Sequence, residues 1–148
     1  QHFIEDMRTS ENPDDQQGLT LILRLMVYSR VLRSDLSTIR LAEHVRNLPM
    51  VYQLGLDYSH IVSNFLQVIK DSDLLDETGR LRTELTNLKK WSDDENATIR
   101  ESVMKHAAMN SLNAVQRLDL LAALRWLNRL ISHTQRLSNV LFEDAKQR

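Results

Sequence analysis

The stretch from Leu118 to Phe142 constrains the fold of this chain more than any other segment. It reads LDLLAALRWLNRLISHTQRLSNVLF and repeats mostly apolar side chains at intervals of three and four residues. These intervals place the side chains on one face of an α-helix. The face comprises Leu120, Ala123, Leu124, Leu127, Ile131, Thr134, Leu137 and Leu141. A long helix with one apolar face requires partner helices that cover this face.

The remainder of the chain favours helices as well. Its 148 residues include only three glycines and two prolines, so the turn signals that separate strands are scarce. A chain of this size can bury a core without disulfides or metal, and it contains no cysteine. We therefore expect residues 1–148 to form a single all-α domain, an antiparallel, up-and-down bundle of about five helices.

The first third of the chain predicts a helix end, a polar turn and a long helix. Residues 1–8 carry apolar side chains at helical spacing, and residues 9–15 collect turn formers around Pro13. A helix should follow up to about residue 47. The next helix is expected over residues 50–70 after Pro49, with Gly55 allowing a neighbouring helix to approach closely.

The middle of the chain predicts a charged turn at residues 71–79 and two shorter helices. The first should dock through Leu81, Leu85, Leu88 and Trp91. The second should begin at Ser92–Glu95, which fits the capping-box pattern of a serine followed three residues later by a glutamate. Its expected apolar positions are Ala97, Met104, Ala108 and Leu112.

Charge and hydropathy restrict the partners of the chain. Nineteen basic and twenty acidic residues give a formal net charge of −1, so we do not expect nucleic acid as a partner. The most apolar run, Leu19–Tyr28, is too short to span a bilayer, and we expect no direct membrane insertion. The chain starts at Gln1 and its first methionine is Met7, which suggests a fragment of a longer, membrane-bound protein.

The histidines, carboxylates and hydroxyls of the sequence do not form a metal-binding or catalytic motif. Asp57 and His60 have the i, i+3 spacing used in di-iron bundles, but such sites need a second pair, and the sequence has none. It also lacks a Gly-x-Ser-x-Gly elbow and a glycine-rich phosphate loop. We therefore predict no enzyme activity, and no catalytic, cofactor-binding or metal-binding residues. A metal-dependent helical-bundle enzyme using Asp57 and His60 is the alternative.

The strongest candidate for a binding surface is the polar side of the Leu118–Phe142 helix. The candidate interaction face consists of Arg125, Trp126, Arg129 and Arg136. Arginine forks match carboxylate and phosphate groups, so this face suits an acidic partner or a phosphate. The alternative is a solvated face whose arginine stems cover apolar neighbours. A second basic cluster contains Arg24, Arg30, Arg33 and Arg40, with Asp35 nearby.

Two segments resemble the PhoU-like domain, which occurs free in bacterial phosphate signalling and fused to the cytoplasmic end of sodium/phosphate symporters. Residues 120–129, LLAALRWLNR, followed by Ile131-Ser132-His133, resemble its last helix. The helix end at residues 2–7, the polar turn and residues 19–35 resemble the start of the symporter-fused kind.

The metal-binding pattern of that family is not preserved. The pattern has an acid directly before an arginine and an aspartate three residues after it. Here Ser29 precedes Arg30, and Asp35 follows at a different spacing. The last helix has Leu124, Arg125 and Asn128 at the matching positions. The resemblance therefore implies no metal or other cofactor for this chain.

The resemblance implies a regulatory or interaction domain of a sodium-dependent phosphate transporter, on the cytoplasmic side of the bacterial inner membrane. Its partner would be its own transmembrane domain or another protein, and a homodimer is a further arrangement. The alternative is the cytoplasmic helical tail of an aromatic-acid exporter of the fusaric-acid-resistance type. The sequence upstream of this chain distinguishes the two, because their membrane spans follow different patterns.

Overall fold

The computed structural model describes residues 23–24, 26–34, 42–69 and 73–147. All regular structure in these ranges is helical, which confirms the all-α prediction for the described residues. The labelled helices are α3 (Ala42–Arg46), α4 (Pro49–Val68), α5 (Leu74–Asp94), α6 (Asn96–Met109) and α7 (Ala114–Gln147). Residues 23–24 and 26–34 are helical too. The helix end and polar turn predicted for residues 1–15 lie outside the described residues.

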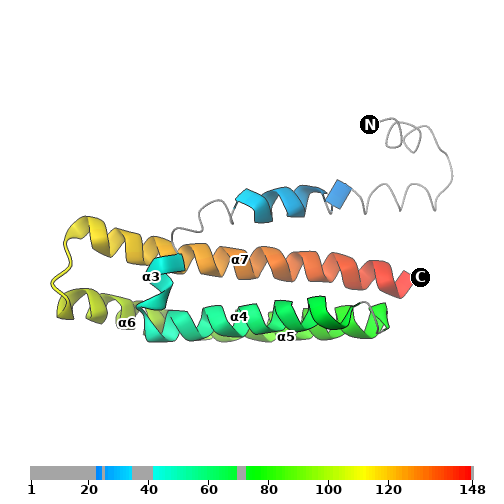
Figure 1. Ribbon diagram of the computed structural model, residues 1–148, viewed down its shortest axis with the longest axis horizontal. Coiled ribbons are helices and arrows are strands. Elements are labelled where there is room, and N and C mark those ends of the chain that lie inside the picture. The colour runs from blue at the N-terminus through cyan, green and yellow to red at the C-terminus, as the bar shows by residue number, and fades with distance from the viewer. Residues whose placement is uncertain (1–22, 25, 35–41, 70–72, 148) are drawn as a thin grey trace.

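The labelled helices form a bundle around α7. Figure 1 shows α5 returning alongside α4, α6 continuing in the direction of α5, and α7 running back along the full length of both. Helix α3 is short and contacts both α4 and α7. Because α5 and α6 are separated only by Glu95, they act together as the partner of the 34-residue α7.

The core lies between α7 and the helices that surround it. It contains Val45, Leu48, Val51, Leu54, Leu88, Ile99, Val103, Ala107, Leu120, Ala123, Leu124, Trp126, Leu127, Leu130 and Ile131. The apolar face predicted for α7 is therefore largely correct. Its first six positions are buried, while Leu137 and Leu141 are half-buried.

Helix α5 starts earlier than the sequence prediction. Residues 74–79 were expected in a turn, but they are helical because the carboxylate of Asp73 caps the helix. Its Oδ1 accepts hydrogen bonds from the backbone N–H of Leu75 at 2.8 Å and of Asp76 at 3.4 Å. The predicted docking residue Trp91 is 40% exposed, so it is not part of the core.

The predicted capping box at Ser92–Glu95 is wrong. Ser92 lies inside α5, is buried, and donates its hydroxyl proton to Oδ1 of Asn128 on α7 at 2.6 Å. Helix α6 begins at Asn96 without a side-chain cap. Its buried positions are Ile99, Val103 and Ala107, whereas the predicted Ala97, Met104 and Ala108 are exposed.

The corner between α6 and α7 is closed by two local motifs. After α6, the backbone N–H of Leu112 donates to the carbonyl of Ala107 at 3.0 Å, and that of Ser111 donates to Ala108 at 3.2 Å. This is the Schellman pattern, with Ser111 in the left-handed conformation at φ 52°. Asn113 and Gln116 then form a reciprocal capping box, with both backbone-to-side-chain hydrogen bonds at 2.9 Å.

We predict that Ser111→Gly stabilises the protein. A non-glycine residue is strained in the left-handed region, and glycine relieves this strain at some cost in chain entropy. The free energy of unfolding should rise by about 0.5 kcal/mol. Urea unfolding followed by circular dichroism measures it, with exposed Ser59→Gly inside α4 as the control that should lose stability.

The two described glycines differ in the space around them. A Cβ added at Gly55 would lie 3.6 Å from Val45 and 3.8 Å from Leu127, which is ordinary contact. The packing therefore does not require a glycine at position 55, although a close helix approach was predicted there. At Gly79 an added Cβ would lie 3.2 Å from the Phe142 ring, over which the Arg82 guanidinium sits at 4.7 Å. The tight approach between helices is at Gly79.

We predict that Gly55→Ala raises the free energy of unfolding by about 1 kcal/mol, the difference in helix propensity. Gly79→Ala should gain clearly less, because the Phe142 ring must shift to admit the new methyl group. Urea denaturation of both variants checks the order. An equal gain in the free energy of unfolding at the two positions would show that the Phe142 ring shifts at no energetic cost.

Candidate functional site: an arginine pocket between α6 and α7

The four residues of the candidate interaction face do not share one environment. Arg125, Arg129 and Arg136 are exposed, as expected for a binding surface. Trp126 is only 6% exposed and belongs to the core. It lies three residues after Ala123 and four before Leu130, so helical geometry places it on the buried side of α7. Trp126 therefore packs in the core and is not part of the exposed surface.

The second basic cluster is only partly described. Arg24, Arg30 and Arg33 are exposed on the helical residues 23–24 and 26–34. Arg40 and Asp35 lie outside the described residues. The helix that carries this cluster contacts the core through Leu32, which is partly buried.

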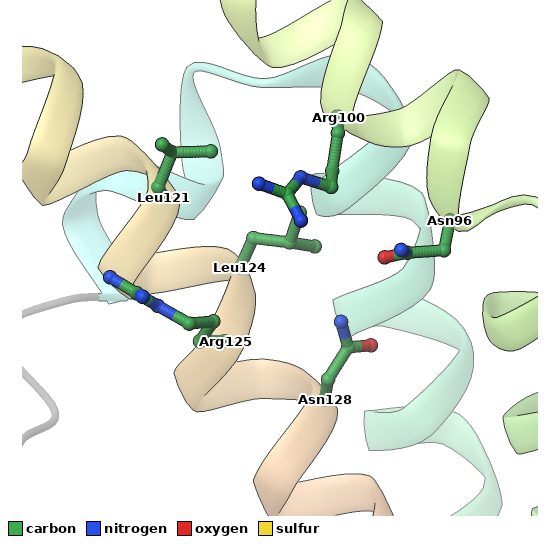
Figure 2. A pocket seen from close by; sticks show the side chains of 6 residues that line it. All are labelled: Asn96, Arg100, Leu121, Leu124, Arg125 and Asn128. Carbon is green, nitrogen blue, oxygen red and sulfur yellow. The ribbon is translucent and has the colours of Figure 1, made fainter.

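A pocket of about 90 Å³ lies between α6 and α7. Figure 2 shows its lining, which comprises Asn96 and Arg100 from α6 together with Leu121, Leu124, Arg125 and Asn128 from α7. On each helix the lining residues are three or four positions apart, so they face the same side. The pocket therefore depends on the packing of two helices that follow one another in the chain.

The pocket is electropositive. Two guanidinium groups line it, from Arg100 and Arg125, and no acidic side chain does. Two ion pairs lie on α5, Arg80 with Glu77 at 3.5 Å and Lys89 with Asp93 at 2.9 Å. The pocket arginines thus belong to neither pair. Leu121 and Leu124 complete the lining with apolar surface.

Asn128 is held in one orientation by α5. Its Oδ1 accepts the hydrogen bond from the buried Ser92 hydroxyl at 2.6 Å. The amide nitrogen is therefore directed toward the pocket. Figure 2 shows it on the side of Asn128 that faces Arg100. Arg100, Arg125 and Asn128 therefore supply N–H donors to the lining of the pocket.

A second cavity, between α4 and α5, is far smaller. It has a volume of about 10 Å³, enough for a single water at most. Its lining is Ile61, Asn64, Phe65, Glu77, Arg80, Leu81 and Glu84. The carboxylate of Glu77 already pairs with Arg80. This cavity does not compete with the arginine pocket as a binding site.

The metal pair considered from the sequence has other contacts. Oδ1 of Asp57 accepts a hydrogen bond from the side-chain amide of Gln53 at 2.9 Å, and His60 is exposed. Among the described residues, no three or more histidine or acidic side chains are grouped as they would be around a metal ion.

Most of the pocket was not identified from the sequence. Arg125 was a predicted site residue. Leu124 was predicted on the apolar face of the helix, and Asn128 was considered only as a replacement for a metal ligand. Asn96, Arg100 and Leu121 were missed. The i, i+4 spacing of Asn96 and Arg100 is a signal for one polar face of α6. Which helix meets that face follows only from the tertiary packing.

Comparisons of the chain with protein-family models, with curated proteins and with solved structures found no match. Fold and site define the class: an all-α bundle domain with a basic pocket between two of its helices. In the part of the chain described by the structure, no helix combines the length and the apolar character needed to cross a membrane.

We predict that Ser92→Ala lowers the free energy of unfolding by about 1–2 kcal/mol, because the buried oxygen of Asn128 loses its donor. Lys89→Ala is the control. It removes an exposed ion pair on the same helix and should cost less than about 0.5 kcal/mol. Urea denaturation measures the free energy of unfolding of both variants. Equal losses in the two would contradict a structural role for the Ser92 hydroxyl.

Proposed function

We propose that this chain is a PhoU-like regulatory or interaction domain of a sodium-dependent phosphate transporter, on the cytoplasmic side of the bacterial inner membrane. It binds a partner through a helix face and does not catalyse a reaction. The observation that carries the proposal is the row of exposed arginines on α7, the helix with the closest sequence resemblance to the PhoU-like domain.

The arginine row consists of Arg125, Arg129 and Arg136. At about 100° per residue, the three positions fall within about 40° of one another around α7. They extend over about 16 Å of the helix axis. The opposite side of α7 is fixed in the core, so the row is presented on a rigid element.

A rigid row of arginines suits an acidic protein surface. Each guanidinium can form a forked pair with a carboxylate, which fixes orientation as well as charge. The partner we favour is the transmembrane domain of the same protein or another protein with an acidic face, and a homodimer is a further arrangement. The net charge of −1 gives no general attraction for nucleic acid.

The complete open reading frame tests the transporter assignment. We expect upstream sequence with repeated hydrophobic spans and a polar midsection rich in glutamine and serine. The span pattern of an aromatic-acid exporter, or an upstream region without spans, would overturn the assignment.

We predict that Arg129→Ala combined with Arg136→Ala weakens association with the membrane domain at least tenfold, without lowering the melting temperature. Pull-down of the purified chain by the membrane domain in detergent, with thermal unfolding in parallel, measures both. The control is Lys90→Ala with Lys105→Ala, which removes the same charge from exposed positions on α5 and α6. An equal loss in the control, or a loss of stability alone, would show that the row has no specific role.

A further inference from the structure

We propose that the pocket between α6 and α7 binds a phosphate group, held by Arg100, Arg125 and Asn128. The pocket shares only Arg125 with the arginine row. The proposal does not depend on the transporter assignment. The volume, the donors and the charge of the pocket all favour a small oxyanion.

The volume fits a small oxyanion. The pocket of about 90 Å³ has room for several water molecules, because a single water needs about 10–15 Å³ by the same measure. A phosphate group has five heavy atoms and falls in this range. A nucleotide or a peptide would have to remain largely outside, with only its phosphate inserted.

The donors come from two helices. Arg100 lines the pocket from α6 and Arg125 from α7. Figure 2 shows the Arg100 guanidinium above Leu124, while the Arg125 guanidinium extends to the side away from Asn128. Each arginine has several N–H donors in a planar fork, and Asn128 adds its amide N–H₂. Ser92 keeps the acceptor oxygen of that amide engaged, so Asn128 faces the pocket as a donor.

The charge also favours an anion. An oxyanion in the pocket can form charge-assisted hydrogen bonds with the two guanidinium groups of the lining. Asn96 is the first residue of α6, so the site adjoins the positive end of that helix dipole. The acids that precede it, Asp93, Asp94 and Glu95, are not part of the lining.

The exposure of both arginines sets the expected affinity. Because Arg100 and Arg125 are open to solvent, ions screen their charges and water competes for their donors. A dissociation constant on the order of 1 mM at low ionic strength is expected. Added sodium chloride should weaken the binding progressively.

The test is a titration of the ¹⁵N-labelled 148-residue chain with inorganic phosphate, followed by NMR at constant pH and ionic strength. We expect saturable shifts at the side chains of Arg100, Arg125 and Asn128, with no matching shifts from sodium chloride. Phosphoserine is the second probe. If it binds more tightly than phosphate, the group recognised belongs to a larger molecule; if it binds more weakly, the site takes the free ion.

Three variants test the assignment of residues. Arg100→Gln and Arg125→Gln should each weaken phosphate binding at least tenfold, whereas Lys105→Gln, a charge-matched control on α6 outside the lining, should leave it within twofold. Asn128→Asp keeps an acceptor for Ser92 but adds a negative charge, so it should abolish binding without unfolding the chain. Melting temperatures verify folding.

The inference is overturned if phosphate shifts no pocket resonance at about ten times the expected dissociation constant, or if chloride produces the same shifts. It is also overturned if Lys105→Gln weakens binding as much as Arg100→Gln, because the effect would then reflect net charge. None of these results bears on the arginine-row variants, which retain Arg100, Arg125 and Asn128.

Discussion

Burial of the inner face of α7 is the constraint on which the described structure depends. This one helix contacts α3, α4, α5 and α6, and it supplies a large share of the core. Each leucine or isoleucine removed from water contributes about 1.5–3 kcal/mol, which exceeds any single polar contact in the bundle. Because the inner face is committed to packing, only the outer side of α7 is left for recognition.

The polar contacts between helices orient side chains more than they stabilise the bundle. The hydroxyls of Tyr58 and Thr134 are 2.8 Å apart and join α4 to α7, while Ser92 joins α5 to Asn128. A neutral hydrogen bond contributes about 1 kcal/mol, but a buried group left without a partner costs more. Such pairs select one register of the helices. In the case of Ser92, the selected register also decides which end of the Asn128 amide faces the pocket.

The apolar face of a single helix was predictable, and the contacts between two helices were not. Apolar spacing identified the buried face of α7, although Trp126 was assigned to the exposed side. The pattern at Ser92–Glu95 matched a capping box, yet Ser92 is inside α5 because its hydroxyl has a tertiary partner. The true box at Asn113 and Gln116 has the same type of pattern. Arg100 lies in the pocket only because α6 packs against α7. The PhoU-like resemblance stays a prediction.

The corner between α6 and α7 bears on the order of assembly. Its hydrogen bonds join residues between His106 and Arg117, so the chain closes on itself there over a very short loop. The entropy lost in closing a loop grows with its length, and this loop is among the least costly to form. The pairing of α6 with α7 requires no long-range search, whereas α4 must find α7 across the intervening helices. The arginine pocket is therefore built from the two helices that the chain brings together most readily.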